Sequence, residues 1–226
     1  MSRIILNFKR PSAELLSKFE GVPTPNLGEA MGKKNNMSSG IRPVYKGARL
    51  CGSAFTVLTP PKDNLTIHKA LELAQKNDVL VIDTGDFIEA GFLGEVICYA
   101  AKIKGLKGIV TNGGVRDIRA IEAMDFPVFS QSICIGGTVK ESFGSINVPV
   151  NCGGVLVNPG DIIVGDDDGV AVVPLNDAER IVSEARKKLD DEKKIMQLIR
   201  DGKSTMEVYG FSKIFEKFKV TYEKGD

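Results

Sequence analysis

The chain has 226 residues, of which 42% are hydrophobic and 26% charged, and its 30 basic and 29 acidic residues leave a formal charge of +1. This composition excludes a mainly disordered chain. The near-balance of charge argues against a strong nucleic-acid or membrane-surface binder, because binding to polyphosphate needs a concentrated basic face. No apolar run approaches the roughly 20 residues of a membrane span, and the first residues lack a secretory signal. We therefore expect one cytoplasmic, globular domain.

The first half of the chain alternates strands and helices. Prolines separate short helices in the first 50 residues, and one of these helices is expected to begin near Thr24. Residues 51–58 alternate like a strand, and residues 63–76 are expected to form a capped helix. Residues 79–83 are a continuous apolar run, which is typical of a strand covered on both faces.

The same pattern then repeats. Glycines open a helix expected over residues 91–105, and residues 108–112 form the next strand. A short helix is expected over residues 117–124 and a further strand over residues 127–129. This β-α-β-α-β order predicts parallel strands with right-handed crossovers.

After residue 145 the pattern becomes all-β and ends with a long helix over residues 175–200. Turn residues separate four short strands, at 148–150, 154–157, 162–164 and 170–173. The sequence therefore predicts an α/β fold in a single layered domain, with mixed parallel and antiparallel strands and a long C-terminal helix.

Cysteine and histidine usage limits the chemistry. The four cysteines lie far apart without a Cys-x-x-Cys pair, and His68 is the only histidine. The spacing of the cysteines argues against a thiolate zinc cage, and a single histidine excludes a multi-histidine metal site. His68 falls among apolar residues of an expected helix and is interpreted as structural, which argues against a catalytic triad. Catalysis would have to use carboxylates, arginine, backbone amides and a metal bound by oxygen.

Two short motifs follow neighbouring strands at the edge where ligands of open α/β sheets gather. Arg116 offers a permanently charged planar donor, and Asp117 offers a hard oxygen ligand suited to Mg²⁺. Free backbone amides at a helix start form a natural carboxylate site. Here these are the amides of Gly94, Glu95, Val96 and Ile97. A structural interpretation stays open, since Asp117 suits an N-cap and Glu95 complements a helix dipole.

Glu192 lies on the apolar stripe of the long helix, which is formed by Ile181, Ala185, Leu189, Met196 and Ile199. A carboxylate on a packing face costs free energy unless it is paired or binds a cation. It either forms a salt bridge or reaches a polar site, including one in a neighbouring subunit. The acidic run at residues 165–169 lacks the ligand spacing of a calcium loop, and a tight hairpin turn is favoured.

These motifs resemble the RraA-like family, which includes the class II 4-hydroxy-4-methyl-2-oxoglutarate (HMG) aldolases. The resemblance covers roughly residues 20 to 210 of a single domain over residues 1–226, and implies an α/β/α swivelling-type fold. It rests on Asp63-Asn64-Leu65, on residues 79–83, on Gly94-Glu95, on residues 112–117 and on residues 159–170.

The resemblance implies a role for each site residue. The amides from Gly94 to Ile97 would hold the carboxylate of a 2-oxo acid, and Arg116 would contact its carbonyl oxygen and stabilise the enolate. Asp117 would bind Mg²⁺ or Mn²⁺, and Glu95 would position a water molecule on the metal for proton transfer. Glu192 would come from the adjacent subunit of a homotrimer or hexamer as a further acid near the metal.

The resemblance also leaves two functions open. One is a metal-dependent lyase that forms a pyruvate enolate, either an HMG aldolase or an oxaloacetate decarboxylase. The alternative is a non-catalytic regulator of ribonuclease activity, because the family includes an RNase E inhibitor. The sequence departs from the aldolase pattern at Glu29, at Ala120 and at Gln131-Ser132-Ile133, which would border the substrate pocket.

Overall fold

The computed structural model describes residues 2–225, which divide into two compact units, residues 2–185 and residues 186–225. The first unit is built on a nine-stranded sheet with the order β1-β6-β5-β3-β2-β10-β11, in which β4 pairs with β5 and β7 with β2. Its strands are β1 (Arg42–Pro43), β2 (Leu50–Leu58), β3 (Asp78–Asp83), β4 (Gly91–Leu93), β5 (Gly108–Val115), β6 (Val128–Ile133), β7 (Ser145–Ile146), β10 (Ile162–Asp166) and β11 (Gly169–Val173).

The centre of this sheet is parallel and its margins are antiparallel. Strands β2, β3, β5 and β6 run parallel, whereas β10 and β11 continue the sheet as an antiparallel hairpin beside β2. Strand β3 is buried at all six positions, which confirms the expectation from its continuous apolar run. The mixed α/β fold with a long C-terminal helix is therefore confirmed.

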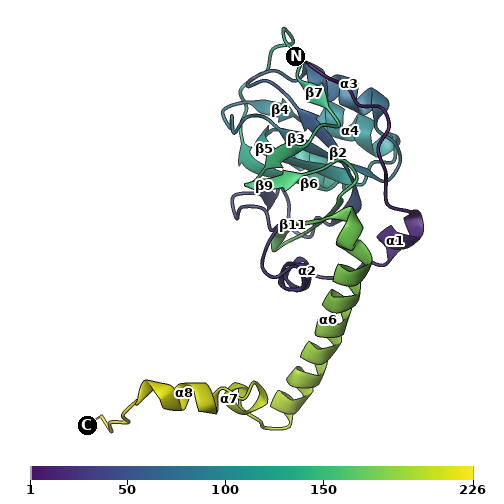
Figure 1. The fold of residues 1–226 in the computed structure, drawn as a ribbon. Helices are drawn as coiled ribbons and strands as arrows, with labels where there is room; N and C mark the ends of the chain where they lie inside the picture. The colour runs from purple at the N-terminus through teal and green to yellow at the C-terminus, as the bar shows by residue number, and fades with distance from the viewer. Residues whose placement is uncertain (1, 226) are drawn as a thin grey trace. The chain divides into compact units, whose positions relative to one another are not determined.

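Three helices cover one face of the sheet: α3 (Leu65–Leu73), α4 (Glu95–Ile103) and α5 (Ile118–Ala123). Figure 1 shows α3 and α4 on the same side of the strands. Their inward side chains join the sheet in a core that includes Phe55, Phe92 and Phe126. A small hairpin, β8 (Val150–Cys152) with β9 (Val155–Val157), lies over a second core that contains Phe129 and Val81.

A third core lies beside the antiparallel hairpin. It joins α1 (Ala13–Ser17), α2 (Thr24–Ala30) and the first residues of α6 (Ala178–Arg200) to β10 and β11. The 3₁₀ turn η1 (Leu175–Asp177) precedes α6. Residues 2–12 are fastened to the sheet by Arg10, whose guanidinium forms two hydrogen bonds of 2.8 and 2.9 Å with the buried carboxylate of Asp78.

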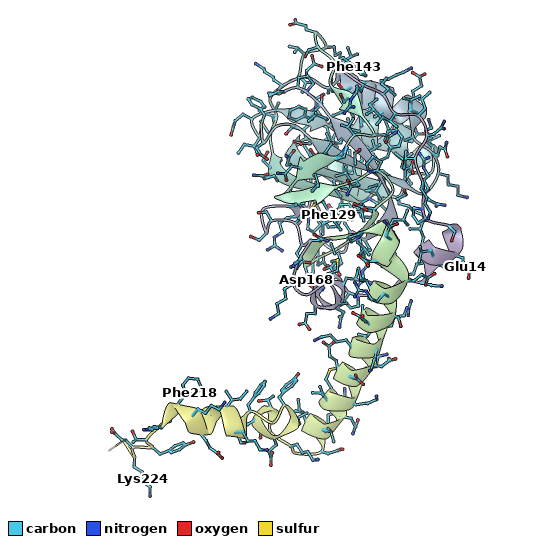
Figure 2. All side chains as sticks on the ribbon, in the orientation of Figure 1. Glu14, Phe129, Phe143, Asp168, Phe218 and Lys224 are labelled. Carbon is cyan, nitrogen blue, oxygen red and sulfur yellow. The ribbon has the colours of Figure 1, made fainter. Side chains whose placement is uncertain are left out.

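The second unit contains the outer part of α6, α7 (Thr205–Val208), α8 (Ser212–Phe215) and the 3₁₀ turn η2 (Glu216–Phe218). None of its described residues is buried. Several of its apolar side chains are exposed, including Phe218, which Figure 2 shows standing away from the ribbon. The expectation of a single domain with a core over about residues 20–210 stays a prediction. No helix within residues 2–225 has the length and apolar character to cross a membrane.

Four expected boundaries are wrong. Strand β5 continues to Val115 rather than ending at residue 112, and β6 continues to Ile133 rather than ending at residue 129. Residues 91–93 form strand β4 rather than opening a helix, because Gly91 pairs with Gly114 of β5 and Leu93 pairs with Val115. Helix α3 ends at Leu73 rather than near residue 76, because Ala74 adopts an extended backbone.

Candidate functional site

The ends of two paired parallel strands bring the two predicted motifs together. Because β4 pairs in parallel with β5, the residues that follow both strands lie at the same edge of the sheet. Gly94 follows β4 as the N-cap of α4, and Arg116 and Asp117 follow β5 at the start of α5. The structure therefore places Gly94, Glu95, Arg116 and Asp117 side by side, as the hydrogen bond described next shows.

Asp117 does not cap its own helix. Its backbone has φ 60° and ψ 38°, which is the left-handed region, and its side chain makes no capping hydrogen bond to α5. Its Oδ2 instead accepts a hydrogen bond of 3.1 Å from the backbone N–H of Glu95, at the start of α4. A non-glycine residue in this region costs about 1–3 kcal/mol, so the surrounding structure holds Asp117 in a strained conformation that faces the neighbouring helix. The structural interpretation of Asp117 as an ordinary N-cap is wrong in this respect.

Glycines make room for the two side chains. A Cβ atom on Gly94 would lie 2.2 Å from Oδ2 of Asp117 and 3.0 Å from Cγ of Arg116. A Cβ atom on Gly91 would lie 3.2 Å from Cδ of Arg116. The side chain of Arg116 therefore runs over the glycine surface of β4, and only a residue without a side chain at position 94 admits the carboxylate of Asp117.

Arg116 and Asp117 converge without neutralising each other completely. The Nε atom of Arg116 lies 3.6 Å from Oδ2 of Asp117, and the two side chains are 49% and 43% exposed. An exposed pair at this distance contributes little to stability. Within the described residues, Oδ1 of Asp117 accepts no hydrogen bond, so half of the carboxylate faces solvent.

The backbone amides of the first turn of α4 differ in whether they already donate a hydrogen bond. The amide of Glu95 already donates to Asp117, whereas those of Val96 and Ile97 belong to the first turn and have no partner inside the helix. The positive end of the helix dipole adds to these donors. The start of α4 therefore offers two adjacent N–H groups to an anion, next to Arg116.

Cys98 is a buried residue of α4 near the site and is not a nucleophile. Burial, and secondly the nearby charge of Asp117, raises the pKa of the Cys98 thiol to about 12. The thiol is fully buried and therefore stays protonated at neutral pH. His68 lies on α3 and is exposed to solvent.

A buried polar network supports the same edge of the sheet, and the sequence interpretation gave it no role. Asn112, inside β5, donates through Nδ2 to Oδ1 of Asp83 at 3.1 Å and to Oδ1 of Asp86 at 2.9 Å. Its Oδ1 accepts from the backbone N–H of Thr84 at 2.8 Å. The backbone N–H of Asn151 donates to the other oxygen of Asp83 at 3.1 Å. A satisfied buried network of this kind holds β5, from which Arg116 and Asp117 follow, to the residues at the end of β3. The only signal in the sequence is that Asp83 and Asn112 each end an apolar run.

Asp63 and Asn64 hold loops rather than forming a simple cap. The side chain of Asn64 makes no capping bond and donates to the carbonyl oxygen of Phe92 at 3.0 Å, which anchors β4 just before Gly94. Asp63 accepts hydrogen bonds from the backbone N–H of Leu65 and, through its other oxygen, from the loop at residues 141–142. Both side chains are thus structural supports of the site edge.

The other residues singled out in the sequence lie elsewhere. Glu192 is on α6 in the second unit, and its approach to Arg116 and Asp117 stays a prediction. The hairpin expected at residues 165–169 is confirmed, because Asp166 pairs with Gly169 across the turn between β10 and β11. Of the residues that depart from the aldolase pattern, Ala120 lies on α5, and Gln131 and Ser132 lie on β6.

A cavity of about 600 Å³ lies at the opposite ends of the parallel strands. Its lining includes Asn77 and Lys107, which immediately precede β3 and β5. The cavity is therefore separate from the Arg116–Asp117 site. Across residues 2–225, no three His, Cys, Asp or Glu side chains gather as the ligands of a metal ion.

The fold and the Arg116–Asp117 site define the class of protein. It is an α/β protein in which charged side chains lie beside the N-terminus of a helix, at the carboxyl ends of parallel strands. The model of the RraA-like family, described as Aldolase/RraA, matches residues 24–172. The chain belongs to this family.

Among the similar proteins, one is named as an aldolase and another is described as a member of a ribonuclease-inhibitor family. The chain is 36% identical over 196 residues to a protein of Halalkalibacterium halodurans named "Putative 4-hydroxy-4-methyl-2-oxoglutarate aldolase", covering 87% of this chain and 93% of the relative. It is 37% identical over 187 residues to an uncharacterized protein of Methanocaldococcus jannaschii, covering 81% and 88%. A crystal structure from Streptomyces coelicolor, described as an unusual member of the RNase ES inhibitor RraA protein family, matches with a TM-score of 0.72 and 28% identity over 83% of this chain and 98% of that one.

Proposed function

We propose that this protein is a divalent-metal-dependent lyase that cleaves small 2-oxo acids through a pyruvate enolate, as an HMG aldolase, an oxaloacetate decarboxylase or both. The observation that carries the proposal is the convergence of Arg116 and Asp117 at the first turn of α4. Nε of Arg116 lies 3.6 Å from Oδ2 of Asp117, and the same oxygen accepts a hydrogen bond of 3.1 Å from the backbone N–H of Glu95. The aldolase names of several relatives support the same class of reaction.

The residues present fit a partly hydrated divalent cation. Asp117 presents a hard oxygen, Oδ1, that no described group occupies, and no cluster of three acidic or sulfur ligands surrounds it within residues 2–225. Mg²⁺ keeps several waters and is often held by one or two carboxylates together with the substrate. Mg²⁺ or Mn²⁺ held by Asp117 would supply positive charge beside the carbonyl group of the substrate.

The chain's own groups account for the remaining steps. The amides of Val96 and Ile97 would hold the carboxylate of the 2-oxo acid, against the surface left open by Gly94. In the aldolase reaction Glu95, acting through water, would take the proton of the substrate's C4 hydroxyl, and the fragment that carries this oxygen would leave as a second pyruvate. In the decarboxylation of oxaloacetate the fragment that leaves would be CO2. In both reactions the electron pair of the broken carbon–carbon bond would pass into the enolate, and the guanidinium of Arg116 would stabilise the negative charge on its oxygen. Glu95, exposed on the first turn of α4, would return a proton through water to the methylene carbon and leave pyruvate.

Glu192 would complete the site from an adjacent subunit of a homotrimer or hexamer. It lies on the α6 helix, most of whose residues beyond Ala185 are exposed. Arg116 and Glu95 would therefore act with a carboxylate from another copy of the chain.

A second function, regulation of a ribonuclease without catalysis, is favoured by one observation. The solved structure from Streptomyces coelicolor belongs to an inhibitor family by its description, and its fold matches 83% of this chain. A regulator of this kind would need neither the strained backbone of Asp117 nor its Oδ1 atom free of hydrogen bonds. For this reason we favour the lyase over the regulator.

The decisive assay couples pyruvate release from oxaloacetate, or from HMG, to a dehydrogenase. We expect turnover to stop after chelation of divalent ions and to return with Mg²⁺. Asp117→Asn should abolish the metal-dependent rate, and Arg116→Ala should lower kcat by about 100- to 1000-fold, because one oxyanion donor is lost.

Arg119→Ala is the matched control, since Arg119 is also an exposed arginine at the start of α5. It should retain the rate of the unmodified protein. The proposal of a metal-dependent lyase would be refuted if Asp117→Asn and Arg116→Ala both left the rate unchanged. It would also be refuted if chelation of divalent ions left the rate unchanged. Capture of a ribonuclease without turnover of either 2-oxo acid would favour the regulator.

A further inference from the structure

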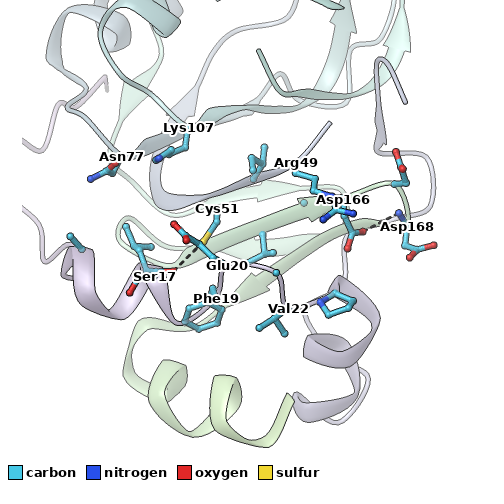
Figure 3. Close-up of a pocket in the computed structure, with 18 residues that line it drawn as sticks. Ser17, Phe19, Glu20, Val22, Arg49, Cys51, Asn77, Lys107, Asp166 and Asp168 are labelled. Atoms are coloured by element: carbon cyan, nitrogen blue, oxygen red, sulfur yellow. Dashed lines mark hydrogen bonds between the residues drawn. The ribbon is translucent and has the colours of Figure 1, made fainter. Parts of the chain in front are cut away.

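A cavity and an exposed apolar segment near the C-terminus contain no residue of the proposed lyase site. The lining of the cavity is net acidic, because Glu20 and residues 166–168 line it together with the two cations Arg49 and Lys107. Figure 3 shows Arg49 beside Asp166, so this cation lies among the carboxylates. The cavity therefore offers a ligand no surface of one kind. The C-terminal segment differs, because its exposed side chains are mostly apolar.

Large apolar side chains make up half of residues 211–222, and all of them are exposed. They are Phe211, Ile214, Phe215, Phe218, Val220 and Tyr222. Phe211, Phe215 and Phe218 are spaced four and three residues apart through α8 and η2, which is the spacing of neighbours on one side of a helix. Exposed apolar surface that is contiguous marks an interaction site. We call residues 209–222 the C-terminal arm.

The apolar surface of the arm is large enough for a stable contact. Phe211, Phe215, Phe218 and Tyr222 are 43%, 39%, 70% and 87% exposed. Complete burial of an aromatic side chain removes about 150–250 Å² from water, so covering these four would bury roughly 350–600 Å². A standard protein interface buries about 800 Å² on each partner. The arm therefore supplies a large part of one side of such an interface.

The charges around the arm favour a protein partner over a lipid surface. Residues 205–225 contain four lysines and three glutamates, so positive and negative charges nearly balance. Binding to an anionic membrane surface depends on a cluster of basic residues with a clear surplus of positive charge. An apolar centre with polar residues of both signs around it is typical of a protein interface.

A second copy of the chain is the partner that the proposed site already requires. Glu192 lies on α6, and the proposed lyase takes this carboxylate from an adjacent copy. The arm follows α6 closely in the chain, so an α6 that reaches a neighbouring copy brings the arm to the same neighbour. That neighbour exposes apolar side chains on α4, the helix that begins at the site.

We propose that the C-terminal arm binds a second copy of the chain and holds Glu192 of α6 at the Arg116–Asp117 site of that copy. The inference rests on the proposed function for the role of Glu192, whereas the binding by the arm is independent of any reaction. The arm itself would touch no substrate and would act by positioning α6.

Sedimentation velocity of the full-length protein tests the binding. Phe215→Ser combined with Phe218→Ser changes two side chains that are not buried, so circular dichroism should show the variant folded. We expect the dissociation constant of the assembly to rise by about 30-fold or more, which is the effect of losing one aromatic anchor. Lys213→Ser combined with Lys217→Ser, in the same segment, is the matched control and should leave the constant unchanged.

A monomeric unmodified protein would overturn the proposal, and so would an equal dissociation constant in the phenylalanine variant. Flotation of the unmodified protein with phosphatidylglycerol vesicles, lost in the phenylalanine variant, would assign the arm to a lipid surface and would also overturn it.

Hybrid assemblies test where the arm places Glu192. Asp117→Asn and Glu192→Gln chains should each be inactive on oxaloacetate. Produced together, they should regain about a quarter of the unmodified rate, because random mixing brings one intact residue of each kind together in that share of the sites. The rate should not return when both chains also carry Phe215→Ser and Phe218→Ser. An equal return with and without these substitutions would overturn the role of the arm. Sedimentation does not depend on turnover, so the binding by the arm and the lyase can fail separately.

Discussion

At the scale of single residues, the backbone conformation of Asp117 determines where its carboxylate lies in the proposed site. Its left-handed conformation turns the carboxylate from its own helix toward the amide of Glu95. The sequence shows an aspartate after a strand, which is equally compatible with a cap, and no local pattern predicts the φ of 60°. The carboxylate meets the start of α4, and this contact is tertiary.

Gly94 gives the sharpest test of this arrangement. Alanine is compatible with the extended backbone at this position, φ −159°, but its Cβ would lie 2.2 Å from Oδ2 of Asp117. We expect Gly94→Ala to displace the carboxylate and lower kcat/KM by about 100-fold, since misplacement of a catalytic group by about 1 Å has an effect of that order.

Steady-state kinetics on oxaloacetate and urea unfolding together measure this effect. Gly137→Ala is the control, because a Cβ atom at Gly137 meets nothing within 4 Å. It should retain full activity. A Gly94→Ala variant that keeps the rate of the unmodified protein would show that the Asp117–Glu95 contact is dispensable.

Asp63 gives a pH-dependent prediction. Burial by itself would raise the pKa of Asp63, but hydrogen bonds from Leu65, Glu141 and Ser142 outweigh it, so the pKa lies below its ordinary value of 3.8. A group with a lowered folded-state pKa contributes stability above the unfolded value, and this stability is lost as the pH falls through the folded value. The Asp63 contribution is therefore complete at pH 7 and declines below about pH 4.

We expect Asp63→Asn to lower the free energy of unfolding by about 1–3 kcal/mol at pH 7, because an amide cannot accept all of these hydrogen bonds. The difference from the unmodified protein should shrink below about pH 4. Urea unfolding across this range measures it, with the exposed Asp190→Asn as a control that changes little. A difference that is constant with pH would contradict the assignment.

At the scale of elements, α4 has two apolar faces. Ile97, Cys98 and Ala101 are buried against the sheet, whereas Val96, Tyr99 and Ile103 are 79%, 59% and 71% exposed. Contiguous exposed apolar surface of this kind marks an interaction site. The face borders the Arg116–Asp117 site, which we expect another copy of the chain to complete.

We therefore predict that Tyr99→Glu combined with Ile103→Glu shifts the protein to smaller species than the homotrimer or hexamer that we propose. A buried charge at an interface is unfavourable unless it is paired, which is why the change should dissociate the copies. Sedimentation velocity measures the assembly. Leu156→Glu, at an exposed apolar position on β9, is the control that leaves it unchanged. A monomeric unmodified protein, or an intact assembly in the double variant, would rule out this face as the interface.

Elements also show where the sequence is informative. The apolar runs that become β3 and β5 are predictable as strands, because both of their faces are buried. Strands β1 and β7 have two residues each and leave no periodic signal. Strand β4 is three residues long and begins with a glycine, so its pairing with β5 becomes visible only in the fold.

At the scale of the whole molecule, the order of the strands in the sheet depends on pairing between distant segments, which the local sequence does not predict. The hairpin of β10 and β11 is predictable as a turn, but its position beside β2 depends on contacts over more than 100 residues. The same pairing, together with α1, builds the cavity at the amino ends of the strands. Sequence reasoning places ligands at the carboxyl ends, and nothing local indicates a second space at the opposite end.

A crystal structure with Mn²⁺ and pyruvate would show whether Asp117 and Arg116 together receive a divalent cation and a 2-oxo acid. We expect an anomalous scattering peak within coordination distance of Asp117, with the pyruvate carboxylate on the amides of Val96 and Ile97 and its carbonyl oxygen beside Arg116. A structure with saturating Mn²⁺ and pyruvate but no peak at Asp117, or with pyruvate bound away from Arg116, would contradict this expectation.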